Sequence, residues 1–342
     1  MVKSDKDVLF HSAGQSEEAN STVFRSMLSK LETPFRKGDR IGIKLHWGER
    51  GNLSHLPPSY AQDVVQHLKN LSVNPFVFDT TVLYSGGRRT GEDSLNTAAE
   101  HGYSEAYLDC PVVIADGMDG RKTVDLPGFK HFKTIQVADI FDSTDGFFIL
   151  SHFKGHMVTG FGGAIKNLSM GFASRAQKQR MHADAHPVLN ASKCTRCGLC
   201  TQVCPTGAAQ FGDMGDPVYD LETCIGCAQC IGVCSEEALR IFWNIDNRVF
   251  LERVIETAAA VWNKIKDRTV LINVLLNISV ECDCFPGHNP LIAPDIGFVG
   301  GYHPVMVDHD SLVKVGKEPF EKAHPGLVWN HQFNYAKEIS FI

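Results

Sequence analysis

Cysteine is the residue whose number and spacing most clearly indicate chemistry in this sequence. Eight of the eleven cysteines lie between residues 194 and 234, in two quartets that share the spacing C-x2-C-x2-C-x3-C. Equivalent cysteines of the two quartets are thirty positions apart, so this stretch is an internal repeat. Thiolates bind soft metals, and short spacers allow three of them to surround one corner of a metal cluster. The quartets are Cys194, Cys197, Cys200 and Cys204, then Cys224, Cys227, Cys230 and Cys234.

The spacing of both quartets resembles that of bacterial-type ferredoxins, which hold two [4Fe–4S] clusters. A structural zinc site and a disulfide framework are the alternatives, and the doubled quartet disfavours both. The apolar segments 208–211 and 238–241 end the two halves and could pair as strands of one small module. In such ferredoxins the fourth cysteine of each run binds the other cluster. We therefore expect one cluster on Cys194, Cys197, Cys200 and Cys234, and the second on Cys224, Cys227, Cys230 and Cys204.

A second group of candidate residues lies in the glycine-rich segment 151–187, which follows an apolar stretch. Glycines allow backbone amides to approach an anion or cofactor closely, although the order matches neither a Walker A nor a dinucleotide motif. A lysine here can pair with an anion or act as a nucleophile, and histidines can transfer protons near neutral pH. Pairing of the lysine with a structural carboxylate is the alternative. The candidates are His156, Lys166 and His182 for catalysis, and Gly160, Gly162 and Gly163 for cofactor binding.

Polar residues also follow the second and third predicted strands. Lys44 and His46 end the strand at 40–45, Asp79 ends the strand at 74–79, and Arg88 lies in the loop that follows. Each of these residues alone is more often structural. Because ligands of parallel α/β sheets bind beyond the carboxyl ends of the strands, we expect the four to line one crevice and contact a cofactor or a small anionic ligand.

The third group follows a buried strand near the end of the chain. Cys282 and Cys284 are too close in sequence for a relaxed disulfide, and His288 lies nearby. Two thiols and a histidine can bind a soft metal, so an additional metal is expected here; two free cysteines at a strand end are the alternative. We expect this pair to face the same cavity as Lys166, because both segments follow core strands of one sheet.

The elements that must position these residues alternate between strands and helices. Strands are predicted at 7–11, 40–45 and 74–79, with helices at 17–31 and 59–71 between them. This alternation predicts an α/β fold with a parallel sheet covered by helices. It resumes after the cysteines, with a helix at 251–265, a strand at 269–276 and a helix at 304–315. We therefore expect an α/β domain, 1–187 and 244–342, interrupted by a ferredoxin-like α+β module, 188–243, that packs tightly against it.

Composition excludes some classes of function. The chain has 342 residues, 43% of them hydrophobic, which is enough for a large core and one small extra module. A formal net charge of −6 provides no basic surface for nucleic acid. The first residues do not form a signal peptide, and no apolar run reaches the length of a membrane span. Thiolate ligands then indicate a reducing cytoplasm, in an organism that tolerates little oxygen.

Most of the chain resembles the domain-of-unknown-function 362 family, whose members are iron–sulfur proteins with a ferredoxin module inserted in an α/β domain. His303 departs from the family's pattern, in which an aspartate precedes Pro304. The resemblance implies the fold and the clusters but no agreed reaction. The matching residues are Asp79 to Tyr84 with Arg88, Phe153 to His156, Gly163 to Asn167, both cysteine quartets, Cys282 to Cys284, Asp295 to Gly297, and Pro304-Val305.

A fainter resemblance is to the nickel-pincer lactate racemase family, through His156, the paired glycines, Lys166 and His182. The glycine pair is shifted by one residue from that family's pattern. The resemblance implies that Lys166 anchors a cofactor, His182 binds a metal and His156 transfers a proton.

Three functions are consistent with these observations. The first is an oxidoreductase whose clusters take electrons from a ferredoxin, flavoprotein or reductase and pass them to a substrate or cofactor in the α/β domain. The others are an electron carrier, and an assembly protein that transfers metal through Cys282 and Cys284. A carrier needs only the ferredoxin module, so the size of the α/β domain and its polar loops favour the oxidoreductase.

Overall fold

The computed structural model describes residues 8–83, 86–182, 187–204, 206–220, 224, 229–240 and 246–342. Among the predicted cluster ligands, Cys227 lies outside the described residues. The predicted helices and strands of the α/β domain are present, with ends that differ by a few residues at most. The strand at Asn74–Asp79 and the helix at Pro304–Val315 have the predicted bounds.

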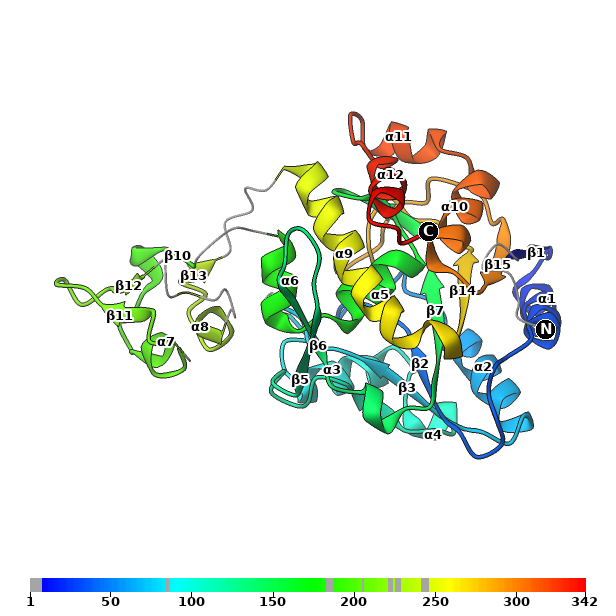
Figure 1. Ribbon diagram of the computed structural model, residues 1–342, viewed down its shortest axis with the longest axis horizontal. Coiled ribbons are helices and arrows are strands. Elements are labelled where there is room, and N and C mark those ends of the chain that lie inside the picture. Colours follow the sequence, from blue (N-terminus) through cyan, green and yellow to red (C-terminus); the bar gives the residue numbers. More distant parts are fainter. Residues whose placement is uncertain are drawn as a thin grey trace.

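A seven-stranded, mainly parallel sheet forms the centre of the α/β domain, in the order β1-β15-β14-β7-β2-β3-β4 (Figure 1). The five strands from β14 to β4 pair in parallel, as expected. Only β15 runs against its neighbours β1 and β14. The strands are β1 (Val8–Ser12), β2 (Arg40–Lys44), β3 (Asn74–Asp79), β4 (Val112–Ile114), β7 (Gly146–His152), β14 (Thr269–Leu275) and β15 (Gly297–Gly301).

Helices cover both faces of this sheet, because its strands are apolar on both sides. In β7, Phe148 and Leu150 pack into one hydrophobic core, and Phe147 and Ile149 pack into the other. The first core is covered by α1 (Glu17–Lys30), α2 (Pro58–Asn70), α3 (Gly91–Glu100) and α4 (Glu105–Leu108). The second is covered by α5 (Ala164–Phe172), α6 (Arg175–His182), α9 (Asn247–Ile265), α10 (Pro304–Val315), α11 (Glu318–Ala323) and α12 (His331–Glu338).

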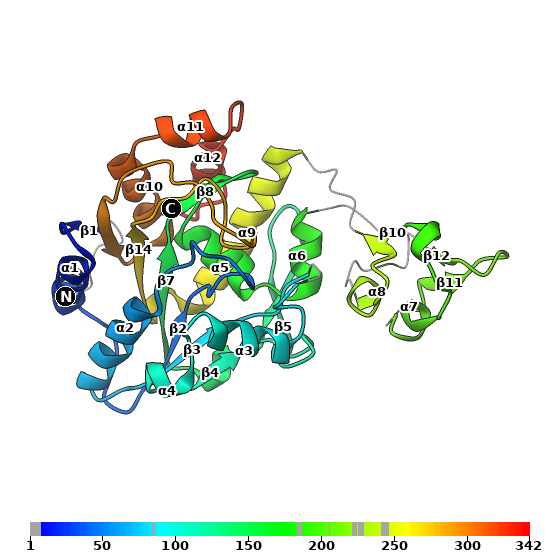
Figure 2. The ribbon, with the colours of Figure 1, turned by 180° about the vertical axis from the view of Figure 1, so that it is seen from behind.

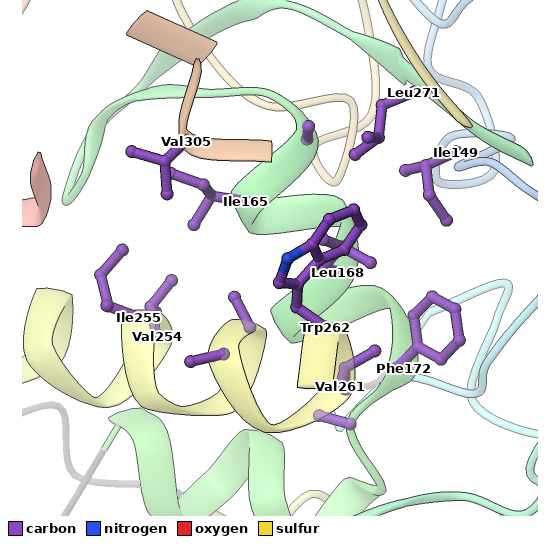
Figure 3. Close-up of a cluster of buried hydrophobic side chains, with 14 of the residues drawn as sticks. Ile149, Ile165, Leu168, Phe172, Val254, Ile255, Val261, Trp262, Leu271 and Val305 are labelled. Carbon is purple, nitrogen blue, oxygen red and sulfur yellow. The ribbon is translucent and has the colours of Figure 1, made fainter. Parts of the chain in front are cut away.

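The second core fixes the position of α5, the helix that carries Lys166. Figure 3 shows Leu168 and Phe172 of α5 beside Val261 and Trp262 of α9, with Ile149 of the sheet close by. All five side chains are at most 3% exposed. Burial of this kind stabilises the fold by about 1.5–3 kcal/mol for each large side chain, so α5 is held firmly against the sheet.

Short hairpins lie outside the sheet. β5 (Thr123–Pro127) pairs with β6 (Thr134–Ala138) in a hairpin that is separate from the central sheet. β8 (Lys154–His156) pairs with β9 (Gly160–Gly162) directly after β7. Single turns of 3-10 helix occur at Phe141–Ser143, Ala191–Lys193 and Lys266–Arg268.

The cysteine-rich module has its own small elements. The two apolar segments expected to pair with each other do not: β11 (Ala209–Phe211) pairs with β12 (Pro217–Tyr219), and β13 (Leu239–Arg240) pairs with β10 (Val188–Leu189). The short helices are α7 (Leu199–Gln202) and α8 (Gln229–Gly232).

The module lies to one side of the α/β domain in both ribbon views (Figures 1 and 2), rather than packed closely against it as the sequence suggested. One described contact is the hydrogen bond from Arg89 Nη2 to the Ile231 carbonyl, at 3.3 Å. Within the α/β domain, the segments before and after the module contact each other directly. The ring of His182, at the end of α6, stacks on Phe250 of α9 at 4.6 Å, and Arg253 Nη1 donates to the Arg180 carbonyl at 2.9 Å.

Within the described part of the chain, no helix is both long enough and apolar enough to cross a lipid bilayer.

Candidate functional site

Several site residues of the α/β domain, most of them predicted from the sequence, lie at the carboxyl ends of four neighbouring strands. Lys44 ends β2, Asp79 ends β3 and His152 ends β7, while Cys282 and Cys284 lie in the loop after β14. The chain leaves β2 towards β3 on one side and leaves β7 towards β14 on the other. The site therefore lies at a topological switch point, where open α/β sheets bind their ligands.

Asp79 is the centre of a buried charge cluster. Its carboxylate is 2.9 Å from Lys44 Nζ, 3.2 Å from His46 Nδ1 and 3.5 Å from Arg88 Nη1. Burial alone would raise the pKa of Asp79, but Lys44, His46 and Arg88 hold it well below its ordinary value. Glu49 accepts from Arg88 Nε at 3.2 Å and completes the set of charges. The four residues predicted to line one crevice therefore do converge.

Lys44 has no hydrogen-bond donor left for a ligand. A lysine ammonium carries three N–H groups, and those of Lys44 have three acceptors: Asp79 Oδ1, Asn167 Oδ1 at 2.8 Å and the Leu45 carbonyl at 2.7 Å. Asn167 in turn donates to the Leu150 carbonyl at 3.0 Å, so it joins β2 to β7 at the switch point. Lys44 thus positions Asp79 and Asn167 instead of reaching into open space.

Cys282 and Cys284 lie beside both Lys166 and His46. Their sulfurs are 3.1 Å apart, Lys166 Nζ is 3.1 Å from Cys282 Sγ, and His46 Nε2 is 3.5 Å from Cys284 Sγ. The predicted proximity of Cys282 and Lys166 is confirmed. The prediction that His288 lies with the two thiols is wrong, because this residue is exposed. Among the described residues, the histidine whose ring nitrogen lies near both sulfurs is His46.

The two thiols of this pair differ in acidity. The hydrogen bond between the two sulfurs lowers the pKa of Cys282 well below that of an ordinary thiol, and Lys166 lowers it further. The same hydrogen bond, together with burial, raises the pKa of Cys284. Burial opposes the charge of Lys166, but the two sulfurs hold its pKa above the usual value. Of the two cysteines, Cys282 is therefore the one whose surroundings favour the thiolate form, with Lys166 on one side and Cys284 on the other.

Asp283 anchors the loop that carries both cysteines. Its fully buried carboxylate accepts from His152 Nδ1 at 3.0 Å and from Lys154 Nζ at 2.5 Å. Burial would raise the pKa of Asp283, but Lys154 and His152 hold it well below its ordinary value. The sequence analysis did not identify these three residues as part of the site. The feature of the sequence that could have identified them is a charged or polar residue between apolar ones, at the end of β7 and after β14.

Helix α5 aims Lys166 at this pair, and a residue far along the chain fixes the start of that helix. Gly163 precedes α5 and has no side chain to cap it. Asp308 of α10 accepts from the backbone N–H groups of Ala164 at 2.6 Å and Ile165 at 2.9 Å. A carboxylate at this position satisfies orphan donors and opposes the positive end of the helix dipole.

His156 and His182 lie close enough to Lys166 for its charge to act on both of them. Nδ1 of His156 accepts from the backbone N–H groups of Val158 and Thr159, at 3.2 and 3.1 Å, so the neutral ring carries its proton on Nε2. Burial and then Lys166 lower the pKa of His156 well below the usual value, and lower that of His182 to about 3. Both rings are therefore neutral near pH 7, and the proton transfer expected of them stays a prediction.

The glycines at 160, 162 and 163 make room for side chains. Gly160 has φ +79°, and a Cβ there would lie 2.6 Å from Trp329 Cβ. A Cβ on Gly162 would lie 3.0 Å from Lys166 Cδ, and one on Gly163 would lie 2.3 Å from Asp308 Oδ1. These contacts explain the glycines through the packing of Trp329, Lys166 and Asp308, and cofactor binding by the three glycines stays a prediction.

In the module, a cavity is lined by cysteines from both halves of the repeat. Its lining includes Cys194, Cys197 and Cys200 of the first run together with Cys234 of the second. Backbone N–H groups donate to sulfur in both halves, from Ala209 to Cys204 at 3.4 Å and from Ala238 to Cys234 at 3.3 Å. The ten described cysteines form no disulfide bonds with one another, so the disulfide framework does not occur among them.

Comparison with known proteins places these features in context. The pyruvate synthase subunit PorD of Methanocaldococcus jannaschii is 36% identical over 53 residues, which are 16% of this chain and 62% of that relative. A solved protein from Thermotoga maritima superposes with a TM-score of 0.46 at 12% identity, covering 92% of this chain and 59% of the other. The lactate racemase apoprotein from Thermoanaerobacterium thermosaccharolyticum gives 0.39 at 11%, covering 78% and 50%.

The match to a protein family covers the α/β domain and the module alike. Residues 41–311 match the family described as Domain of unknown function (DUF362). The matched range begins in β2 and ends within α10, so it includes the cysteine-rich module and both cysteines of the loop after β14. The chain belongs to the DUF362 family.

Proposed function

We propose that this protein is an iron–sulfur oxidoreductase that passes electrons through two [4Fe–4S] clusters to a substrate or cofactor in the α/β domain. The observation that carries the proposal is the cavity lined by Cys194, Cys197, Cys200 and Cys234. Three ligands from one run and the fourth from the other are what crossed ligation in a two-cluster ferredoxin requires. By the symmetry of the repeat, Cys224, Cys227, Cys230 and Cys204 would hold the second cluster.

The similarity to PorD, a subunit of pyruvate synthase, supports an electron-transfer role. The partner would be a ferredoxin, a flavoprotein or a reductase that exchanges single electrons with the clusters. Backbone N–H groups that donate to Cys204 and Cys234 suit thiolate ligands, because hydrogen bonds to sulfur raise the reduction potential of such clusters.

The acceptor would bind at the switch point, where Lys166 and the Cys282–Cys284 pair meet the Asp79 cluster. Lys44, Arg88 and Lys154 each pair with a carboxylate, whereas Lys166 faces the sulfur of Cys282. Lys166 is therefore the cation best placed to attract a small anionic ligand. A second candidate function is metal or cofactor assembly, and the observation that favours it is the proximity of His46, Cys282 and Cys284.

Cluster ligation can be tested by comparing single serine variants of anaerobically purified protein. The wild type should contain about eight irons and eight labile sulfides. Cys234→Ser should leave the same residual cluster spectrum as Cys197→Ser, since both residues would serve the first cluster. Cys204→Ser should instead match Cys230→Ser. Electron paramagnetic resonance of the reduced protein distinguishes the two patterns, and a Cys234→Ser spectrum that matched Cys230→Ser would refute the assignment.

The role of the α/β domain can be tested in the same preparation with Lys166→Ala. The variant should keep its iron content and cluster spectrum but lose turnover or ligand capture. Normal electron transfer to the native acceptor and normal ligand binding in this variant would refute the proposed acceptor site.

A further inference from the structure

Three side chains of the α/β domain present ligand atoms of the kind that soft and borderline metals prefer. His46 Nε2, Cys282 Sγ and Cys284 Sγ all lie within 4.8 Å of one another. In a tetrahedral zinc site, bonds of about 2.3 Å to sulfur and 2.0–2.1 Å to nitrogen separate a sulfur and a nitrogen ligand by roughly 3.6 Å. The observed distance between His46 Nε2 and Cys284 Sγ is 3.5 Å. The two sulfurs, now 3.1 Å apart, would separate to roughly 3.8 Å, which a small side-chain rotation supplies.

The residues around these ligands are those that a metal site needs. Metal-bound histidines almost always donate their other ring N–H to a carboxylate, a backbone carbonyl or a water molecule, which fixes the tautomer. His46 Nδ1 is 3.2 Å from Asp79 Oδ2, so donation there leaves the Nε2 lone pair facing Cys284. Arg88 Nη1 is 3.0 Å from the same ring nitrogen and 3.5 Å from Asp79 Oδ2, which offers it a carboxylate acceptor, while Arg88 Nε donates to Glu49 at 3.2 Å.

The loop that carries the sulfurs is held as firmly as the histidine. Asp283, between the two cysteines, is fixed by His152 and Lys154, and its carbonyl accepts from the backbone N–H of Glu49 at 2.8 Å. The sulfurs are therefore held beside the chain segment that carries His46. A rigid surround of this kind is what distinguishes a metal site from a chance meeting of side chains.

We propose that His46, Cys282 and Cys284 bind one thiophilic divalent ion such as Zn²⁺, with the fourth coordination position open to a small anion beside Lys166. Three protein ligands and an open position are typical of catalytic zinc sites, and two cysteines with one histidine are a known ligand set of that type. This site is separate from the cluster cysteines and does not depend on the proposed electron transfer.

The position of Lys166 indicates why the fourth ligand should be an anion. The neighbouring cations Lys44, Arg88 and Lys154 pair with the carboxylates of Asp79, Glu49 and Asp283. Lys166 instead faces a sulfur, with its Nζ 3.1 Å from Cys282 Sγ. An anion such as a carboxylate that bound the metal beside Cys282 would therefore have a buried ammonium close to it.

Cobalt binding tests the proposal, because Co²⁺ bound by thiolates absorbs visibly through sulfur-to-metal charge transfer. Anaerobic protein with its clusters intact should take up one equivalent of Co²⁺ with this absorption, as a difference spectrum against the unloaded protein. Cys284→Ser and His46→Gln should each weaken Co²⁺ binding at least tenfold. Cys282→Ser combined with Cys284→Ser should abolish the absorption while the iron content stays that of the wild type.

His288→Gln and Cys110→Ser are matched controls, since they alter the same residue types outside the proposed ligand set, and both should bind Co²⁺ normally. Thermal unfolding followed by circular dichroism shows whether each variant is folded. Acetate should change the ligand-field bands of the Co²⁺ protein, and should do so more weakly in Lys166→Met. Unchanged cobalt binding in the double cysteine variant, or loss in His288→Gln but not in His46→Gln, would overturn the ligand assignment. A cobalt spectrum that acetate does not change would overturn the open position.

Discussion

Replacement of Asp79 by asparagine should strongly destabilise the α/β domain. The carboxylate is 3% exposed and faces Lys44 at 2.9 Å, His46 at 3.2 Å and Arg88 at 3.5 Å. Asparagine keeps the shape but removes the charge, and its amide nitrogen faces donors instead of acceptors. Removal of one partner from a buried ion pair costs about 3–5 kcal/mol, because the other charge stays buried without compensation. We expect Asp79→Asn to lower the free energy of unfolding by that amount.

Urea unfolding of anaerobic protein, followed by far-ultraviolet circular dichroism, measures this loss. Asp63→Asn is the matched control, because Asp63 also pairs with an arginine, Arg25, at 2.8 Å, but that arginine side chain is 64% exposed. Such exposed pairs contribute about 0–1 kcal/mol. The two variants should therefore differ by at least about 2 kcal/mol. Equal losses in both would show that the buried cations do not depend on Asp79, and the account of the charge cluster would fail.

The same comparison has an expected pH dependence. The neighbouring cations hold the pKa of Asp79 below its value in the unfolded chain. Its contribution to stability is therefore complete above the ordinary aspartate range, and it is lost as the pH falls through that range towards the folded pKa. The difference between wild type and Asp79→Asn should be largest near neutral pH and smaller in acid.

Three further predictions each concern a single residue. Gly163→Ala should lower the free energy of unfolding by about 1–3 kcal/mol in urea, because its Cβ would lie 2.3 Å from Asp308 Oδ1; a neutral result would mean that α10 shifts freely. Burial lowers the pKa of Lys178 to about 8, so wild-type stability should rise relative to Lys178→Met by on the order of 2 kcal/mol between pH 7 and 9.5, and parallel pH curves would contradict this. Trp262→Ala should cost about 3–5 kcal/mol by calorimetry or urea unfolding, since the indole is 3% exposed in the core of Figure 3, and a loss below about 1 kcal/mol would show that the core refills.

Local sequence signals predicted the individual elements well. The helix at Pro304–Val315 begins with a proline at its first position and ends before Gly316, so both ends were visible in the sequence. The buried strand β3 was visible as a short apolar run after a turn. The direction of β15 was not, because an apolar run of five residues reads the same in a parallel and an antiparallel pairing.

Contacts in the site between residues far apart in the sequence were also hard to predict from local patterns. The meeting of Lys166 with Cys282 followed from a general rule, that residues beyond the carboxyl ends of neighbouring strands converge. The histidine beside Cys284 was not predictable from nearby sequence. The order of the strands brings His46, 238 positions away, to 3.5 Å from Cys284, whereas His288, four positions away, is not part of the group. Asp308 reaches the start of α5 across 144 positions, and no pattern near Gly163 announced it.

The stacking of His182 on Phe250 has a consequence for how the protein is made. The chain leaves the α/β domain and returns to it at nearly the same point, so the module is a side loop whose closure the host itself secures. A long loop closed in this way adds only a small entropic penalty to folding of the rest of the chain. The α/β domain can therefore fold before the proposed clusters are inserted into the module, and loss of one of these clusters to oxygen need not unfold it. A host and its insertion connected like this can be acquired, exchanged or lost separately in evolution, with the residues beyond β2, β3, β7 and β14 left in place.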